Sequence, residues 1–300
     1  AAESSGGIKA ATHAGRIGQL RGLLTRMEEI ESRLMTLLAQ QRTLFPRGFL
    51  LSDSDLLRLL SLEGQPALLP PVVRLCFPGC SRVELQDTFF AGLRGPGGRR
   101  LPLEPVSCSG PVPAALDALH RAVSPAVKGM LGMLASAEVD NGWEGLSSLA
   151  ATEDGGPMLW LCEAAAAATA CRAVERAWAL GQAGPSSLAA LEEKMASDAV
   201  SMAFWLGSGR LAGPAGREGQ ARVLVEHNWW RDVVQRLADS VEGASGPSSF
   251  AWQCHLRMYW AEEGGVCWSI GSQRGEFPGQ WLDASGPAAW AGSSAPSLLW

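Results

Sequence analysis

Apolar residues recur at three- and four-residue steps along residues 17–44, near the start of the chain. The recurring positions are Ile17, Leu20, Leu24, Met27, Ile30, Leu34, Leu37, Leu38 and Leu44. This spacing predicts one long helix with an apolar stripe, because residues three and four apart lie side by side on a helix. Its other face carries Arg21, Arg26, Glu28, Glu29 and Arg33. We expect the stripe to pack into a helical bundle. A dimeric coiled coil is the alternative, which requires about three or four uninterrupted heptads.

Residues 45–61 contain the end of this helix and the start of the next. Pro46 has no amide hydrogen and disfavours the helical conformation at Phe45, so the long helix must end there. Ser52 or Asp53 can cap a new helix, and Ser52 with Asp55 has the spacing of a capping box. The leucines that follow form its apolar face: Leu56, Leu57, Leu59, Leu60 and Leu62. Gly64 and Pro66 close the element.

Further helices are expected along the rest of the chain, separated by clusters of glycine and proline. Apolar spacing and helix propensity predict a short helix within residues 67–77 that begins at the prolines, and further helices over residues 114–137, 157–178, 186–206 and 250–260. Pro125 should kink the second of these, and the pair Asn141 and Gly142 should end it. Residues 143–156 then form a connector, and residues 181–185 break the next helix. Residues 92–100 are expected to form a solvated turn, and residues 266–270 can form a strand.

These expectations give a mainly α fold, an elongated rod of successive helical bundles with little or no β structure near the C-terminus. Residues 1–16 form a frayed start, and residues 17–142 form a first helical part. Residues 143–265 form a second helical part, and residues 266–300 an irregular tail. All twelve tryptophans lie from Trp143 onward, so the two helical parts differ in composition.

Composition narrows the classes of protein that the chain can belong to. With 47% hydrophobic and 18% charged residues among 300, the chain can bury a substantial core. A net charge of -5 gives no electrostatic reason to bind nucleic acid or an acidic membrane. No apolar run reaches the roughly 18 residues of a membrane span, so we expect a soluble, cytoplasmic protein. The chain begins at Ala1 without a signal peptide, which suggests a segment of a longer protein.

Candidate chemistry is sparse. Residues 207–212 fit the glycine-rich dinucleotide fingerprint, but a helix precedes them where a strand is required, and Gly213 and Pro214 should break the helix that must follow. The sequence contains neither the phosphate-binding loop of nucleotide hydrolases nor the nucleophile elbow of hydrolases. Paired glutamates such as Glu28 and Glu29 are adjacent rather than facing, which does not suit acid and base catalysis.

Metal binding is the remaining chemical alternative. Cys76 and Cys80 lack a second cysteine or histidine pair at zinc spacing, so we expect buried structural thiols. His227, Cys254, His255 and Cys267 could converge on a metal, but two adjacent residues point to different sides of a helix. Packing in a core is the better explanation for these four residues. We therefore predict no catalytic, cofactor-binding or metal-binding residue in this chain, and reduced thiols for all seven cysteines.

Three motifs resemble the linker region of dynein heavy chains. The first contains Phe45, Pro46, Arg47, Leu51, Ser52, Leu56, Leu57 and Leu60. The second contains Arg231, Asp232, Val233 and Val234, and the third contains Phe250, Trp252, Leu256, Arg257, Tyr259 and Trp260. Gly48 stands where the family has an aromatic residue, and Ala168 where it has a tryptophan. On the predicted helix, the aromatic residues of the third motif share one face.

The resemblance implies a mechanical function. In dynein heavy chains this region is a helical lever lying across a ring of AAA+ modules, and it couples ATP hydrolysis to minus-end-directed movement on microtubules. ATP and Mg would bind in the ring, and the parent protein would hydrolyse ATP. The implied partners are that ring, dynein intermediate and light chains, and microtubules, with no nucleic acid and no membrane. The implied location is the cytoskeleton of a ciliary or flagellar axoneme. The alternative is a non-motor helical scaffold that binds proteins through its tryptophan-rich half.

Overall fold

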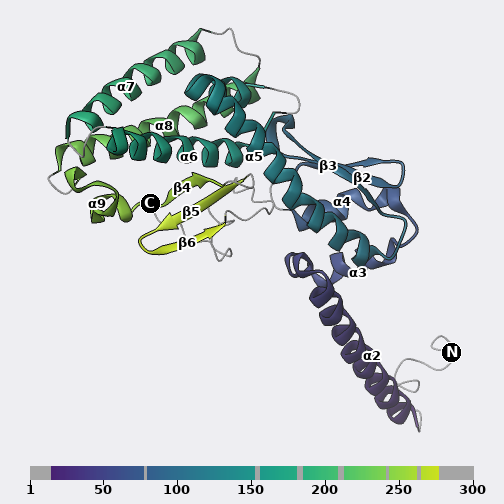
Figure 1. Ribbon diagram of the computed structural model, residues 1–300. Coiled ribbons are helices and arrows are strands. Elements are labelled where there is room, and N and C mark those ends of the chain that lie inside the picture. Colours follow the sequence, from purple (N-terminus) through teal and green to yellow (C-terminus); the bar gives the residue numbers. More distant parts are fainter. Residues whose placement is uncertain are drawn as a thin grey trace.

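The computed structural model describes residues 15–77, 80–152, 156–180, 185–208, 213–240, 243–261 and 265–276. Helices predominate in these residues, as predicted, and two small antiparallel sheets accompany them. Figure 1 shows a body of helices and sheets from which one long helix projects. None of the helices in the described ranges combines the length and apolar content that a membrane span requires.

The projecting helix is α2 (Arg16–Leu44), and its boundaries confirm the prediction. Phe45 is extended, and the chain continues through the short helix η1 (Pro46–Leu50) into α3 (Asp53–Ser61). Ser52 caps α3, because its Oγ accepts a hydrogen bond of 3.1 Å from the Asp55 amide. The short elements η2 (Pro66–Leu68), α4 (Pro70–Val73) and η3 (Arg74–Cys76) follow.

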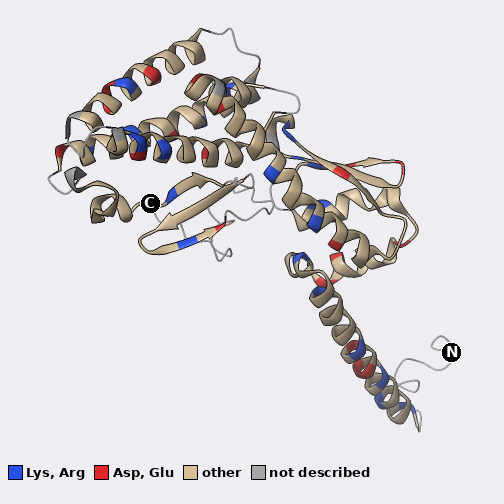
Figure 2. Cartoon of the chain, in the orientation of Figure 1, with Lys and Arg blue, Asp and Glu red and all other residues tan. Residues whose placement is uncertain are grey.

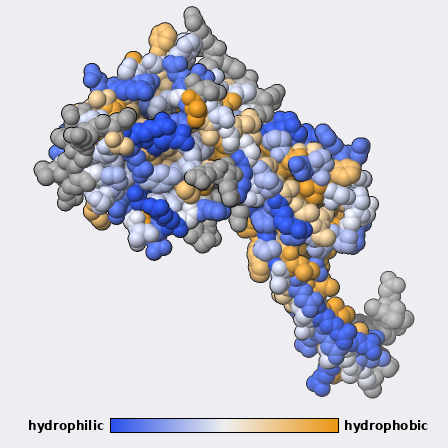
Figure 3. All heavy atoms as spheres, viewed as in Figure 1, coloured by the Kyte–Doolittle hydropathy of each residue, from blue (hydrophilic) through white to orange (hydrophobic). Residues whose placement is uncertain are grey.

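The apolar stripe of α2 does not pack into a bundle in the described structure, which contradicts our expectation. Ile17, Leu20, Met27 and Ile30 are each between 60% and 66% exposed, and only Leu38 on this helix is buried. Figure 2 shows charged residues gathered on the N-terminal half of the same helix, and Figure 3 shows apolar atoms beside them. The sequence reveals an apolar stripe but not whether another element of the chain covers it.

The first sheet was not predicted. Its strands are β1 (Arg82–Gln86), β2 (Phe89–Arg94) and β3 (Arg100–Ser107), paired in the order β1-β2-β3. The short helix η4 (Pro96–Gly98) turns β2 into β3, so residues 92–100 belong to a hairpin rather than to a free loop. Gly92 permits this pairing, because a Cβ there would lie 2.9 Å from the Glu84 carboxylate and 3.1 Å from the Leu101 carbonyl oxygen.

Four long helices form most of the body: α5 (Val112–Ala150), α6 (Leu159–Leu180), α7 (Pro185–Gly207) and α8 (Pro214–Asp239). Pro125 lies inside α5 and does not end it. The expected end at Asn141 and Gly142 is an interruption instead, with Gly142 at φ 57° and ψ -136°, after which helix resumes. The connector expected over residues 143–156 is therefore wrong for residues 143–150. The predicted break at 181–185 falls mostly outside the described residues.

The C-terminal part corrects two predictions. Residues 250–260 are not one helix, because α9 (Phe250–Gln253) is followed by the strand β4 (Arg257–Trp260). This strand pairs with β5 (Val266–Ile270), which in turn pairs with β6 (Gln273–Glu276), so the region has more β structure than expected. Aromatic and β-branched residues favour strands once a partner strand is present, and that pairing is not local. The predicted strand at 266–270 is confirmed. The short helix η5 (Gly243–Ser248) precedes α9.

Two clusters of buried side chains stabilise the body. The first core contains buried residues between positions 38 and 168, with Val266 added from β5. The second core contains buried residues between positions 143 and 252, mostly from α6, α7 and α8. Helices α5 and α6 contribute to both cores, so they join the two parts of the body.

Candidate functional site

The first family motif forms the joint between α2 and the body. Arg47 donates from Nε to His120 Nδ1 at 3.1 Å and from Nη1 to the Cys76 carbonyl oxygen at 3.0 Å. Its guanidinium lies 4.7 Å from the centroid of the Phe77 ring. Burial, and then the charge of Arg47, lower the pKa of His120, so the imidazole stays neutral and Nδ1 can accept. Arg47 thus ties η1 to α5 and η3.

Arg42 fixes the turn that follows α2. It donates from Nε to the Gly48 carbonyl oxygen at 3.3 Å and from Nη2 to the Leu51 carbonyl oxygen at 3.1 Å. Its Nη2 also lies 2.7 Å from Asp53 Oδ1 at the start of α3. Of the motif residues, Phe45, Leu51 and Leu56 are buried, and Leu57 and Leu60 pack against the same core. Pro46 and Ser52 are exposed and set the backbone.

A second joint depends on a buried arginine that sequence reasoning missed. Arg99 is 1% exposed, although residues 92–100 were expected to be a solvated turn. It donates from Nη1 to the Pro157 carbonyl oxygen at 2.6 Å and from Nη2 to the Ala150 carbonyl oxygen at 2.7 Å. A Cβ at Gly219 would collide with Arg99 Nη2 and with the Ala150 carbonyl oxygen. This joint therefore connects the first sheet to the end of α5, the start of α6 and α8.

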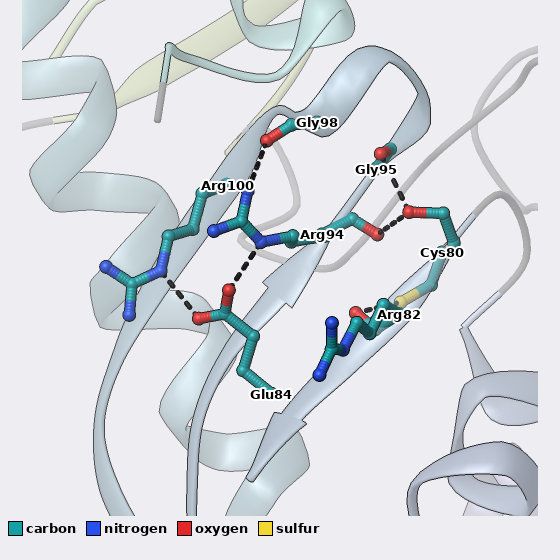
Figure 4. Close-up of polar contacts among 8 residues, drawn as sticks. Cys80, Arg82, Glu84, Arg94, Gly95, Gly98 and Arg100 are labelled. Carbon is teal, nitrogen blue, oxygen red and sulfur yellow. Dashed lines mark hydrogen bonds and ion pairs between the residues drawn. The ribbon is translucent and has the colours of Figure 1, made fainter. Parts of the chain in front are cut away.

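Arginines line the end of the first sheet (Figure 4). Arg82 pairs with Arg94, and Arg94 pairs with Arg100, so the three lie in one row across the strands. Glu84 accepts from Nε of Arg94 and from Nε of Arg100, the latter at 2.7 Å. Burial alone would raise the pKa of Glu84, but the hydrogen bonds and charges of the two arginines hold it below its usual value. This carboxylate offsets repulsion within the row.

The third family motif connects the C-terminal sheet to the helices. Trp252 is fully buried, with its ring centroid 5.3 Å from that of Trp178 and 5.9 Å from that of Trp230, both edge-on. Arg257 donates from Nη2 to Ser269 Oγ at 3.0 Å, which ties β4 to β5. Tyr259 donates from its hydroxyl to Glu175 Oε1 at 2.8 Å, which ties β4 to α6.

The remaining members of this motif lie closer to the surface. The guanidinium of Arg172 lies 5.9 Å from the ring centroid of Trp260, and Leu256 is half-buried. Phe250 is 77% exposed and does not join the core. Because β4 replaces the predicted helix, these residues do not share one helical face, although Trp252 and Tyr259 both pack on the second core.

The second family motif lies on α8. Val233 and Val234 are fully buried in the second core beside Trp230. Arg231 lies 3.9 Å from Glu192 of α7 and 3.4 Å from Asp232. The second motif therefore shares the second core with Trp252 and Tyr259 of the third, while Trp260 and the first motif pack in or against the first core.

Of the residues considered for metal binding, the two histidines serve in packing, whereas Cys254 is exposed, contrary to our expectation. His227 is fully buried, with its ring 4.1 Å from that of Trp143, and His255 lies 5.6 Å from Trp229. Within the described ranges, no three histidine, cysteine or acidic side chains are grouped to hold a metal. All seven cysteines are free thiols, and Cys76 and Cys80 are buried as predicted. Burial raises the pKa of Cys76 to about 12, so it stays protonated.

The dinucleotide fingerprint begins at the end of α7, and residues 209–212 lie outside the described residues. Gly207 and Ser208 therefore follow a helix, not the strand that such a site requires. Pro214 begins α8, at the first position of a helix, where proline is tolerated.

Comparison with known proteins finds similarity to dynein heavy chains. Residues 2–133 match the family model of the dynein heavy chain, N-terminal region 2. The chain is 24% identical over 271 residues to the dynein-1-beta heavy chain, flagellar inner arm I1 complex, of Chlamydomonas reinhardtii, a match covering 87% of this chain and 6% of that protein. The chain is similar to dynein heavy chains over most of its length.

Two mammalian dyneins extend the comparison. Mouse dynein axonemal heavy chain 1 is 26% identical over 257 residues, covering 82% of this chain and 6% of that protein. Human dynein axonemal heavy chain 3 is 36% identical over 61 residues, covering 20% of this chain and 2% of that protein. The dynein resemblance inferred from the three motifs is thus confirmed. The chain spans about 6% of the length of the Chlamydomonas and mouse dyneins.

Proposed function

We propose that this chain is the linker, a mechanical lever, of a dynein-like heavy chain. It would couple ATP hydrolysis in an AAA+ ring to minus-end-directed movement on microtubules. The observation that carries the proposal is similarity to dynein heavy chains across 87% of the chain. The positions of the three family motifs support it, because most of their residues serve in contacts between elements.

A lever must transmit force through its joints without local melting. Arg47 and Arg99 suit this role, because each joins segments distant in sequence through charge-assisted hydrogen bonds. Such bonds are stronger than neutral ones, and a buried arginine is costly to expose or to leave without its acceptors. Under load, these joints keep α2, the first sheet and α5 moving together.

A lever that bends also needs a hinge. Gly142 interrupts α5 with a backbone conformation that only glycine adopts readily, and nothing lies within 4 Å of a Cβ built there. We propose that residues 17–142 and 143–265 are the two parts that move about it, with residues 181–185 as a second candidate hinge. Residues 1–16 would be a frayed start and residues 266–300 a tail toward the first AAA+ module.

The wider context follows from the relatives. Their names place them in axonemes or in a flagellar inner arm, so we propose a ciliary or flagellar location on the cytoskeleton. ATP and Mg would bind in the ring of the parent protein. Intermediate chains, light chains and microtubules would be partners through that parent, and we expect no nucleic acid or membrane partner.

A chimeric motor tests the proposal. In it, residues 17–265 of this chain replace the matching segment of the flagellar inner-arm heavy chain. Both ATP-driven microtubule gliding and ATP turnover are then measured. The matched control carries the corresponding segment of mouse dynein axonemal heavy chain 1. We expect gliding with both grafts and none when the segment is deleted. ATP turnover without gliding, in the graft from this chain alone, would contradict a lever function.

The scaffold alternative makes a different prediction. A non-motor scaffold would bind proteins through its tryptophan-rich half, but Trp178, Trp230 and Trp252 are buried in the second core. These three side chains pack between helices and are not exposed to bind another protein, which favours the lever function.

A further inference from the structure

The N-terminal two thirds of α2 has an apolar face that the described chain leaves uncovered. Leu20, Leu23, Met27 and Ile30 are between 54% and 66% exposed, and Leu37 is 44% exposed. Figures 1 and 3 show this helix standing away from the body with apolar atoms at its surface. A helix with so much apolar exposure is typical of an interaction surface.

The apolar residues of this face follow a heptad repeat, in which Leu34 is half-buried against the first core and the others are exposed. Positions a are Leu20, Met27 and Leu34, and positions d are Leu23, Ile30 and Leu37. Gln41 and Leu44 extend the repeat to the joint, which gives about three and a half heptads, although Leu34 and Gln41 are partly buried at the joint end. The outward positions b, c and f are mainly polar or small: Arg21, Gly22, Thr25, Glu28, Glu29 and Ser32. This pattern suits a two-stranded coiled coil better than a broad bundle face.

We propose that α2 pairs with α2 of a second copy of this chain in a parallel, in-register coiled coil. Arg26 occupies position g, and Glu31 occupies the following position e. In a parallel pair, position g of one helix faces the next position e of the other, so Arg26 meets Glu31 of the second copy in two symmetric ion pairs. An antiparallel pair would bring g beside g, and Arg26 would approach Arg33. The charges therefore select the parallel orientation.

The helix also needs stabilisation that the body does not supply. Gly18 and Gly22 lie in its first two turns, and each costs about 1 kcal/mol relative to alanine in a helix. Only Leu38 on α2 is buried, so packing against the body stabilises just its C-terminal end. Pairing would bury the apolar residues at positions a and d, here called the seam. That burial would offset the free-energy cost of the two glycines. Both bodies would then lie at the same end of the paired helices. This inference does not depend on the proposed lever function.

The test measures the mass of the full chain in solution by light scattering over a range of concentrations. We expect a species of twice 31.7 kDa that dissociates on dilution. Ile30→Glu should raise the dissociation constant by about a hundredfold or more, because it places a charge in both halves of the seam. Met35→Glu is the matched control, since Met35 is 50% exposed at the outward position b. It should leave association unchanged.

Orientation is tested separately. In a Cys254→Ser background, which removes the exposed cysteine, Leu23→Cys should form an interchain disulfide under mild oxidation. Only a parallel, in-register pair brings the two copies of position 23 together. Arg26→Glu and Glu31→Arg should each weaken pairing, and the double variant should restore it. Trp143 is the first tryptophan in the sequence, so none lies on α2. Tryptophan fluorescence therefore checks that the body stays folded.

Three results would overturn the proposal. A 31.7 kDa monomer at every concentration means that another segment or protein covers the seam. A dimer that resists Ile30→Glu has a different interface. A dimer without the disulfide from Leu23→Cys is not parallel and in register.

Discussion

Replacing Gly142 by alanine tests whether α5 is interrupted where the proposed lever bends. Gly142 has φ 57° and ψ -136°, a conformation that side-chain-bearing residues rarely adopt. An added Cβ meets nothing within 4 Å, so the cost of Gly142→Ala is a backbone cost alone. Such strain amounts to about 1–3 kcal/mol, and we expect the free energy of unfolding to fall by that amount.

Gly129→Ala is the matched control on the same helix. Gly129 is exposed, has helical neighbours on both sides, and also has nothing within 4 Å of an added Cβ. Without an unusual φ, alanine there should stabilise the helix by about 0.5–1 kcal/mol. The assay is urea unfolding of the full chain, followed by circular dichroism and by tryptophan fluorescence. The opposite signs of the two changes are the diagnostic result. If Gly142→Ala also stabilises the chain, α5 is a continuous rod and Gly142 is not a hinge.

Three further predictions concern the cores and the joints. Trp252→Ala should cost about 3–5 kcal/mol of unfolding free energy, because its ring is fully buried against two tryptophans, whereas Trp205→Ala should cost much less, since Trp205 is 45% exposed. An unchanged urea midpoint for Trp252→Ala would show that the ring is exposed. Arg99→Met should cost about 2–5 kcal/mol, because it leaves the buried carbonyl oxygens of Ala150 and Pro157 without donors, and Arg100→Met at the surface should cost less than about 1 kcal/mol. Equal losses for the two arginine variants would rule out the buried joint. Burial, and then the charge of Glu163, raise the pKa of Glu226 to about 7 in the folded chain. The folded state then binds more protons than the unfolded state, so this group's contribution to stability is full below about pH 4.5 and is lost as pH rises through about 7. Glu226→Gln should therefore stabilise the chain at pH 8 and have little effect at pH 5, and an effect that does not change with pH would refute the shift.

The long helices could be predicted from the sequence because their causes are local. Apolar spacing located α2 and α7, alanine content located α6, and Pro46 and Ser52 located the end of α2 and the start of α3. Proline removes a donor and serine supplies an acceptor wherever they occur, so these boundaries do not depend on the rest of the fold.

Apart from residues 266–270, the strands could not be predicted, because their causes are distant in sequence or ambiguous. Residues 257–260 suit a helix as well as a strand by spacing, and pairing with Val266–Ile270 decides between the two. In the first sheet, register shifts at Glu84 and Phe90 disturb the simple alternation that would reveal strands.

The two joints could be predicted from the sequence only in part. The first motif was found because its residues are close together in the chain, although their contacts with His120 and Cys76 were not foreseen. Arg99 was missed, because its acceptors are carbonyl oxygens more than fifty positions away and no residue type marks them. The apolar stripe of α2 was recognised, but a stripe alone does not reveal its partner.

The most direct measurement of the lever is a distance within a working motor. Fluorescent labels at Thr25 on α2 and at Gln273 on β6, both exposed positions on either side of Gly142, would report bending in a heavy chain that contains this segment. We predict that energy transfer between the labels changes when ATP is added. It should stay constant in a ring variant that cannot bind ATP. Constant transfer in a motor that still moves microtubules would contradict the claim that this segment is the lever.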